Sequence, residues 1–306
     1  MSGALPDGDL VRLPRGAFCL SIDLELLWGV WDHVTASDAR ACAALEREIV
    51  RRLLALFRSH ELAVTWAFVG RLLDDSHGFD GLRGDRRCWY APDLIDAIRD
   101  DPVDHEIATH SYGHIYFGES SAEAVRDDLT RARAVHESHG LPFRSLVFPR
   151  NQVDHLDVVA QAGIEVFRSV DAGVLDAVSR RAPRLRPVVN LADKALPVAP
   201  PMVQPVRRDH GLVELPSSLL LIGRNGLRRV VTPAALRAKL RAGLARAVET
   251  GELFHLWFHP SNFYTSMQSQ LEVLDAALGE AAELRRQGRL DVLPMCAFGS
   301  AAVPVS

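Results

Sequence analysis

The chain alternates short apolar runs with longer segments of helical periodicity, and this alternation limits its fold more than any other feature. Runs with the character of β-strands occur near residues 17–23, 62–70, 105–111, 143–149, 164–170, 212–222, 253–260 and 290–294. Between most of them lie segments whose apolar residues recur every three or four positions, as in an amphipathic helix. Several β-α units without a break in composition predict one parallel α/β domain, closed as a barrel or nearly so.

The whole chain, residues 1–306, is expected to form a single domain with a core over about residues 17–293. The least regular stretch covers residues 171–210 and is rich in proline and arginine. We expect it to be a long loop or a small excursion near the active face. In folds of this class functional groups gather where strands end and loops begin, so we expect the chemistry at the strand ends.

Composition and charge exclude several classes of function. A formal net charge of -4 gives no basic surface for nucleic acid or an anionic membrane. The four cysteines are widely spaced and form no CxxC pair, so neither a zinc knuckle nor a disulfide framework is predicted. No segment approaches the roughly 18 apolar residues of a membrane span, and residues 1–16 lack the apolar stretch of a signal peptide. These features favour a cytoplasmic protein.

Two acidic residues stand at the end of the first apolar run. Asp23 and Glu25 are two positions apart in SIDLE, so a strand would direct both side chains to one face. Two like charges there repel each other and lose hydration, and a bound cation would offset both costs. The pair indicates a cation site or, with about equal weight, an exposed strand end with two solvated acids.

Three histidines lie in HEIATHSYGH, residues 105–114. His105 and His110 are five positions apart, which does not fit the helical HExxH zinc motif. His110 and His114 are four apart, and one helical turn or a tight loop can direct both at one ion. Imidazole suits zinc and its first-row neighbours, and three protein ligands plus a water make an open catalytic site. We therefore predict a metal site that includes His110 and His114.

A further histidine ends the run LFHLWFHP, residues 253–260. His259 precedes Pro260, which stops the ladder, whereas His255 lies in mid-strand and is expected to be structural. An imidazole titrates near neutral pH, so His259 at the mouth of the sheet is a candidate general acid. The alternative is an ordinary histidine of a surface loop.

Arginine, asparagine and tryptophan side chains complete the set of candidates. In FPRNQ, Arg150 follows a strand and is a candidate to orient a catalytic carboxylate or neutralise developing charge, unless it is an ordinary surface arginine. Asn151 beside it is a candidate contact to substrate. Trp28 and Trp31 follow the two acids and suit an aromatic platform for a sugar ring. Packing is expected for one of the two, and Trp28 is taken as the substrate contact.

The order of these motifs resembles that of the NodB-type polysaccharide deacetylases, carbohydrate esterase family 4. The resemblance lies in an acid pair, then HSxxH at 110–114, then an element with arginine and proline, then LxxHP at 256–260, each at a strand end. It implies a distorted (β/α)7-type barrel and a divalent metal, most often Zn2+, with Co2+, Ni2+ or Mn2+ as alternatives. It also implies hydrolysis of an N-acetyl group, in some members an O-acetyl group, on a sugar or glycoconjugate.

Three departures from the family pattern mark the chain as divergent. In the usual TFDDG the second Asp binds the metal, but here Leu24 has that place, and Glu25 one residue on fits a D-x-D-like variant. The usual R-x-P-[YF] is replaced by FPRNQ, in which Arg150 follows the proline. The Asp that tunes the acid histidine has no clear counterpart, and Asp171 is the nearest candidate.

The resemblance implies a role for each candidate. The metal ligands would be Glu25, His110 and His114. Asp23 would take the proton of the attacking water, and His259 would protonate the departing nitrogen. A backbone N–H near Tyr112 would help to hold the oxyanion.

Two other functions remain open on the same scaffold. One is hydrolysis of a non-acetyl amide, such as a formamide or a ureide ring. The other is a non-catalytic carbohydrate-binding descendant, which Leu24 and the altered arginine motif would favour and which would bind its ligand without turnover. The three histidines at the motif positions favour an enzyme. The sequence leaves the sugar, the acyl group and the oligomeric state unspecified.

Overall fold

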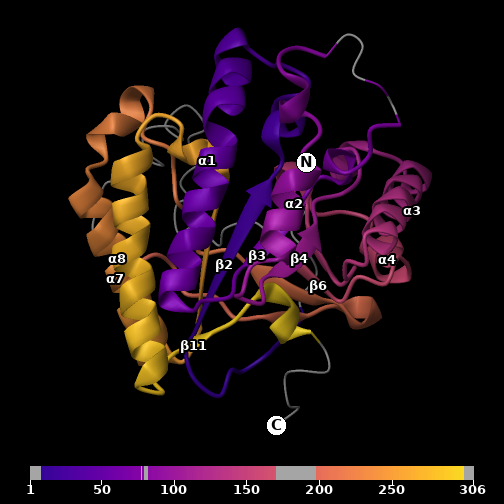
Figure 1. Cartoon of the computed structure of the whole chain (residues 1–306). Coiled ribbons are helices and arrows are strands. Elements are labelled where there is room, and N and C mark those ends of the chain that lie inside the picture. Colours follow the sequence, from indigo (N-terminus) through magenta and orange to yellow (C-terminus); the bar gives the residue numbers. More distant parts are fainter. Residues whose placement is uncertain (1–7, 77, 79–81, 170–197, 300–306) are drawn as a thin grey trace.

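The structure is a computed structural model that describes residues 8–76, 78, 82–169 and 198–299. Its strands form one mixed sheet that curls into a half-barrel, with helices packed around the outside (Figure 1). This confirms the predicted single α/β domain with a distorted barrel. Asp171 and most of the predicted excursion lie outside the described residues.

The described elements follow one another as alternating strands and helices. The strands are β1 (Asp9–Leu10), β2 (Ala17–Leu24), β3 (Thr65–Phe68), β4 (Glu106–Thr109), β5 (Ser145–Val147), β6 (Val166–Ser169), β7 (Val206–Arg207), β8 (Val213–Pro216), β9 (Leu219–Leu220), β10 (Leu253–Phe258) and β11 (Asp291–Val292). The α-helices are α1 (Ala36–His60), α2 (Pro92–Arg99), α3 (Ala122–Ser138), α4 (Leu156–Gln161), α7 (Pro233–Thr250) and α8 (Met267–Arg286).

The strand order brings together motifs that are far apart in the sequence, because β2 lies between β3 and β10. The order is β1-β7-β8-β6-β5-β4-β3-β2-β10-β9, with β11 also beside β2. Every pairing is parallel except those of β7 with β1 and with β8. The run predicted as one strand at 212–222 is divided at residues 217–218, and its halves β8 and β9 pair with different strands. Parallel strands end at one edge, so the motifs that follow β2, β4, β5 and β10 meet there.

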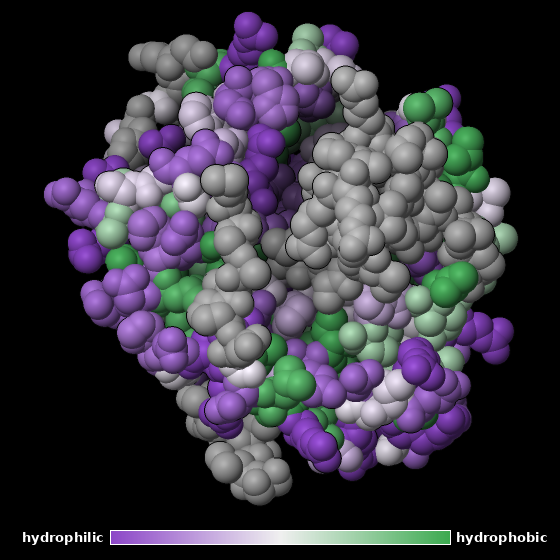
Figure 2. Space-filling model, turned by 180° about the vertical axis from the view of Figure 1, so that it is seen from behind, coloured by the Kyte–Doolittle hydropathy of each residue, from purple (hydrophilic) through white to green (hydrophobic). Residues whose placement is uncertain are grey.

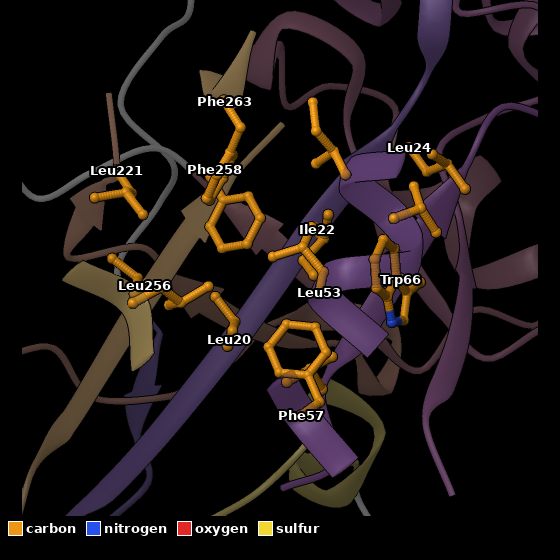
Figure 3. Close-up of a cluster of buried hydrophobic side chains, with 14 of the residues drawn as sticks. Leu20, Ile22, Leu24, Leu53, Phe57, Trp66, Leu221, Leu256, Phe258 and Phe263 are labelled. Atoms are coloured by element: carbon orange, nitrogen blue, oxygen red, sulfur yellow. The ribbon is translucent and has the colours of Figure 1, made fainter. Parts of the chain in front are cut away.

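The alternation of side chains along β2 explains why it carries both core and site residues. All eight of its residues are buried. Leu20, Ile22 and Leu24 belong to the large apolar cluster between the sheet and the helices, where Leu53 and Phe57 of α1 meet them (Figure 3). The alternate positions Cys19 and Ala17 belong to a smaller cluster of mostly small side chains in the barrel interior. Asp23 continues this inward-facing series.

The start of α1 is fixed close to the end of β2. Only a short 3-10 helix, η1 (Leu26–Val30), separates them. Thr35 caps α1, since its side chain accepts from the Asp38 amide while the Asp38 side chain accepts from the Thr35 amide.

None of the helices in the described ranges is long and apolar enough to cross a membrane. Polar side chains cover much of the described surface seen from behind, and apolar ones form small groups (Figure 2).

Candidate metal centre

A pocket of about 300 Å³ lies at the carboxyl ends of the central strands. Its lining residues include Asp23, Glu25, Gly29, His110, His114, Arg150, Asn151, Trp257 and His259. The acid pair, both histidines of HSYGH and the histidine of LWFHP therefore converge, as the parallel arrangement predicts. Leu24, which departs from the family pattern, is buried in the outer apolar cluster on the opposite face of β2 and does not occupy the site.

Glu25, His110 and His114 form a compact group of possible metal ligands. Oε2 of Glu25 lies 3.2 Å from Nε2 of His110 and 3.1 Å from Nε2 of His114. One ligand atom from each residue falls within 4.8 Å of the others. Both histidines are buried, at 1% exposure each. A carboxylate and two imidazoles are a donor set that zinc and neighbouring metals accept.

The hydrogen bonds of the two rings test whether a cation fits. His110 Nδ1 lies 2.7 Å from the Val147 carbonyl oxygen, so it carries the proton, and a neutral ring presents the Nε2 lone pair to Glu25. Nε2 of His114 is also buried and faces the same Glu25 oxygen at 3.1 Å, without a hydrogen bond within the described part of the chain. A cation shared by the three residues would satisfy both Nε2 atoms and the carboxylate oxygen that they face. The residues present therefore fit a divalent metal.

The pKa values show how strongly these groups depend on one another. For Glu25, burial would raise the pKa, but His259, His110 and His114 hold it well below its usual range. For His110, burial would lower the pKa, but Glu25 and Asp23 raise it above its ordinary value. For His114, burial prevails and the pKa is lowered. The protonation of each of these three groups therefore depends on the charge of the other groups in the pocket.

An acid of α3, which the sequence analysis did not single out, holds the loop after β4 that carries His110 and His114. Asp128 of α3 is buried and accepts hydrogen bonds from the amides of Tyr112 and Gly113, each at 2.8 Å. The Tyr112 hydroxyl donates to Asp74 at 2.6 Å. With its amide and hydroxyl both bonded to acids and its side chain outside the pocket lining, Tyr112 supports the loop, which corrects its expected role as a substrate contact. The sequence gives no signal for this role of Asp128, because a helical pattern does not show which loop covers a given residue.

Arg168 of β6 forms the closest ion pair in the site. Its Nη1 and Nη2 each lie 2.6 Å from one carboxylate oxygen of Asp23, and its guanidinium lies 4.3 Å from the centre of the Trp257 ring. Both partners of the ion pair are buried. Burial alone would raise the pKa of Asp23, but the Arg168 charge and its hydrogen bonds lower it below the ordinary value. Asp23 is thereby held ionised and fixed in orientation.

Arg150 has a different place from the one expected. Its Nη2 lies 3.3 Å from Oδ1 of Asp32 and 3.4 Å from the Gly29 carbonyl oxygen, at the rim of the pocket. Arg168 therefore orients Asp23, which corrects the expectation for Arg150. The available signal was a charged residue inside the apolar run IEVFRSV. Asn151 does line the pocket, and its Oδ1 lies 3.3 Å from Arg168 Nη2.

His259 faces both acids from the end of β10. Its Nε2 lies 3.6 Å from Oδ2 of Asp23 and 3.4 Å from Oε1 of Glu25. Its backbone N–H donates to Asn262 Oδ1, while its side chain accepts from the Asn262 amide. The ring is thereby held at the start of the next turn. His255 is buried within β10 and bonds Ser21, as expected for a structural histidine.

The two tryptophans divide into one that packs and one that is exposed. Trp28 is buried, donates its indole N–H to the Trp89 carbonyl oxygen, and packs edge-on against the Trp89 ring at 4.8 Å. This corrects the choice of Trp28 as a substrate contact. Trp31 is 50% exposed. Asp171, the candidate tuning acid, lies outside the described residues.

Unusual backbone conformations gather around this pocket. Eight described non-glycine residues have left-handed φ values, and five of them are Leu26, Ser111, His114, Arg150 and Asn151. Such conformations persist where the surrounding structure enforces them, which is frequent at functional sites. Gly29 adds a tight constraint, because a Cβ there would lie 1.9 Å from Oε1 of Glu25. The Glu25 side chain can therefore hold its present position only if residue 29 has no Cβ.

Comparison with known proteins adds a family match within the chain. Residues 37–167 match the model of the family described as "Polysaccharide deacetylase". This segment includes His110 and His114. No curated protein matches the chain.

Solved structures share the whole fold at low sequence identity. A "putative polysaccharide deacetylase" from Mycobacterium smegmatis has a TM-score of 0.63 and 18% identity, over 95% of this chain and 92% of that one. The Puue allantoinase has a TM-score of 0.59 and 14% identity, over 99% and 97%. A "probable polysaccharide deacetylase" from Pseudomonas aeruginosa PAO1 has a TM-score of 0.57 and 13% identity, over 91% and 87%. The chain is therefore similar to the polysaccharide deacetylase family over residues 37–167 and shares its whole fold with these solved structures.

Proposed function

We propose that the protein is a metal-dependent hydrolase that removes an N-acetyl or related acyl group from a sugar or glycoconjugate. The observation that carries this proposal is the meeting of Glu25, His110 and His114 beside Asp23 and His259 in one pocket. The family match supports a deacetylase. The metal, the residue roles and the sugar are parts of the proposal.

The proposed metal ligands are Glu25, His110 and His114. A divalent metal, Zn2+ in the first place, lowers the pKa of a bound water and polarises the acyl carbonyl. Gly29 leaves Glu25 its space, and Asp128 holds the loop that carries both histidines. The chain therefore supplies three ligands and supports each of them.

Asp23 is the proposed base, and His259 the proposed acid. Arg168 keeps Asp23 ionised, so Asp23 has a free lone pair for the proton of the attacking water. His259 Nε2 faces the same space, within 3.6 Å of Asp23 Oδ2, and would give a proton to the departing nitrogen. With Tyr112 bonded to Asp128, its amide has no part in the proposed mechanism.

The test combines metal content with turnover. The purified protein, reconstituted with zinc, cobalt, nickel or manganese in turn, is expected to hold about one ion per chain by mass spectrometry and to release acetate from N-acetylated sugars. His110→Ala and His114→Ala should lose metal and activity together, and Glu25→Gln should weaken metal binding. Asp23→Asn should keep the metal but lose turnover by about 10²–10⁴-fold. The exposed His139→Ala serves as the control.

Three results would count against the proposal or one of its parts. Full metal occupancy in the His110→Ala and His114→Ala proteins would remove both residues from the ligand set. Near-normal turnover of Asp23→Asn would make the assignment of the base wrong. Ligand binding without turnover in a metal-loaded protein would favour the carbohydrate-binding descendant.

Hydrolysis of a cyclic ureide is a second candidate function. The observation that favours it is the similarity in fold to the Puue allantoinase over nearly the whole length of both chains. Either substrate could be attacked at a carbonyl carbon by water in the same pocket, so the site residues do not separate the two candidate functions. A panel of N-acetyl sugars, formamides and allantoin, measured with the same metal-loaded protein, would do so.

A further inference from the structure

The charge of the chain is distributed unevenly, and one segment has no acidic residue over 34 positions. Residues 215–248 contain seven basic residues and neither Asp nor Glu, in a chain whose formal net charge is -4. The segment runs from the end of β8 through β9 and a short 3-10 helix, η8 (Gly226–Val230), into α7. A local surplus of positive charge is therefore concentrated between two elements of the sheet and its helical cover.

The most exposed part of this segment is the turn formed by residues 225–230, between β9 and α7. All six of its residues are exposed, and we call it the 225–230 turn. Leu227 is 81% exposed and Val230 is 63% exposed. Arg228 and Arg229 stand between them, and neither forms an ion pair with an acid in the described part of the chain. The turn therefore presents a basic surface, which corrects the expectation drawn from net charge alone.

Buried neighbours hold the turn in place at both ends. Before the turn, the Ile222 carbonyl oxygen accepts a hydrogen bond from the buried Gln270 side chain at 2.7 Å. After the turn, the Val231 carbonyl oxygen accepts one from Nε of Arg224 at 2.9 Å. Ile222 and Val231 are both buried in the large apolar cluster. The apolar side chains of the turn are therefore exposed by a segment whose two ends are fixed.

The 225–230 turn follows a strand that ends at the same edge as the catalytic pocket. β9 pairs in parallel with β10, the strand that His259 follows. A Cβ on Gly223 would lie 3.0 Å from the Asn262 carbonyl oxygen, so the segment contacts the short turn that begins after His259. Helix α7 then returns along the outside of the sheet beside α8 (Figure 1). The exposed apolar and basic side chains therefore lie at the catalytic edge of the molecule.

This combination of side chains fits the surface of a membrane that contains anionic lipid. Guanidinium groups bind lipid phosphates, and apolar side chains beside them enter the layer between the headgroups and the acyl chains. A soluble polyanion would use the arginines but leave Leu227 and Val230 in water. Charges farther than about 8 Å are largely screened at physiological ionic strength, so acids elsewhere on the protein oppose this contact only weakly.

We infer that the 225–230 turn binds the protein reversibly to an anionic membrane surface. Leu227 and Val230 enter the headgroup layer, while Arg228 and Arg229 contact lipid phosphates. The bound molecule then holds its catalytic edge towards the lipid. This inference goes beyond the proposed function and does not depend on it, because binding to lipid is measured without turnover.

The experiment is cosedimentation of the protein with lipid vesicles at several salt concentrations. One set of vesicles contains equal parts of phosphatidylcholine and phosphatidylglycerol, and the other contains phosphatidylcholine alone. The protein is expected to bind the mixed vesicles, more weakly as salt is added, and to bind the neutral vesicles much less. Each arginine near an anionic surface contributes about fivefold, so Arg228→Gln combined with Arg229→Gln should weaken binding about 25-fold.

A second pair of substitutions tests the apolar contact. Leu227→Ser combined with Val230→Ser should weaken binding to the mixed vesicles about tenfold or more. This loss should be similar at low and high salt, because salt screens the charges but not the burial of apolar surface. The dependence on salt thus separates the two kinds of contact.

Two control variants change similar side chains elsewhere on the surface. Arg51→Gln combined with Arg52→Gln removes two adjacent exposed arginines of α1, both of which pair with Glu48. Leu10→Ser removes an apolar side chain that is 65% exposed in β1, at the other end of the strand order. Neither control should change binding to the mixed vesicles.

The outcomes decide between a membrane and other partners. Loss of binding in both turn variants, with both controls unaffected, would support the inference. An active hydrolase that does not bind the mixed vesicles, or binds them equally well with Arg228→Gln and Arg229→Gln, would overturn it and leave the proposed function standing. Binding to heparin that needs the arginines but not Leu227 or Val230, without binding to vesicles, would assign the turn to a soluble polyanion and overturn the membrane assignment.

Discussion

Two buried carboxylates at opposite ends of the barrel interior have opposite chemistry. Asp23, at the carboxyl end of β2, is paired with Arg168, and its pKa is lowered. Glu106, at the start of β4, accepts hydrogen bonds from the Thr65 hydroxyl at 2.7 Å and the Cys296 amide at 2.9 Å. Burial raises its pKa, because these neutral donors offset only part of the lost hydration. The two acids share burial, and a nearby cation decides which of them stays ionised.

The pH dependence of stability should therefore have opposite signs at the two ends. A lowered pKa means that the Asp23 contribution is present above its ordinary pKa and is lost as the pH falls below it. A raised pKa means that the Glu106 contribution is complete below its ordinary pKa and is lost as the pH rises towards the raised value. One end therefore favours an ion, and the other favours a neutral acid.

Removal of the positive charge of Arg168 should have the largest effect. Arg168→Met leaves Asp23 buried and unpaired, so we expect the free energy of unfolding to fall by about 3–5 kcal/mol, with turnover reduced about 100-fold or more. Arg150→Met is the matched control, because its ion pair with Asp32 is exposed and contributes at most about 1 kcal/mol. Chemical denaturation and kinetic assays measure both.

A less severe change covers the case in which Arg168→Met does not fold. Arg168→Lys keeps the charge but loses the two parallel hydrogen bonds, so it should be intermediate in both measurements. Equal effects of Arg168→Met and Arg150→Met would contradict the contrast between a buried and an exposed ion pair.

An added methyl group at position 29 tests how closely the chain packs around the Glu25 carboxylate. The Cβ of Gly29→Ala would lie 1.9 Å from Glu25 Oε1, so the carboxylate must move, and metal affinity should fall about 10–100-fold. Gly118→Ala is the control, because its Cβ would lie 3.4 Å from Gln152 Oε1, an ordinary contact. Titration against a chelator measures both affinities, and unchanged affinity in Gly29→Ala would exclude Glu25 from the metal site.

The smallest effect is expected at the other end of the barrel. Glu106→Gln replaces an acid that favours its neutral form by a neutral amide, so the pH-dependent loss of stability above about pH 4 should disappear. Near pH 7 the variant should be more stable than the parent by about 1 kcal/mol, with turnover unchanged. Thermal unfolding at several pH values measures this. A parent protein that instead gains stability relative to the variant as the pH rises would contradict the raised pKa of Glu106.

Local patterns were sufficient for the fold and for the side chains that meet at strand ends. The alternation of strand and helix runs predicts parallel strands, and these bring Glu25, His110 and His114 together. The spacing of Asp23 and Glu25 also predicts that both line one pocket. These inferences need only two rules: parallel strands end at the same edge of a sheet, and alternate residues of a strand face the same side.

Contacts across the barrel required more than local patterns. Arg168 meets Asp23 although three strands, β3, β4 and β5, lie between β6 and β2 in the sheet. That contact depends on how strongly the sheet curls, which no local pattern gives. The same limit applies to Asp128, whose partners are fixed by where α3 packs, and to Trp28, whose burial depends on Trp89.

The pairing of β2 with β10 has a consequence for synthesis of the protein. β2 ends at Leu24 and β10 begins at Leu253, yet the two strands lie side by side along six residue pairs. At about 5–20 residues per second, ~10–50 s pass between their appearances on the ribosome. During that interval Glu25, His110 and His114 are already made, while one edge of the central strand has no partner. The nascent chain therefore carries all three proposed metal ligands before it can fold completely, and this edge of β2 stays open to wrong pairing until β10 is made.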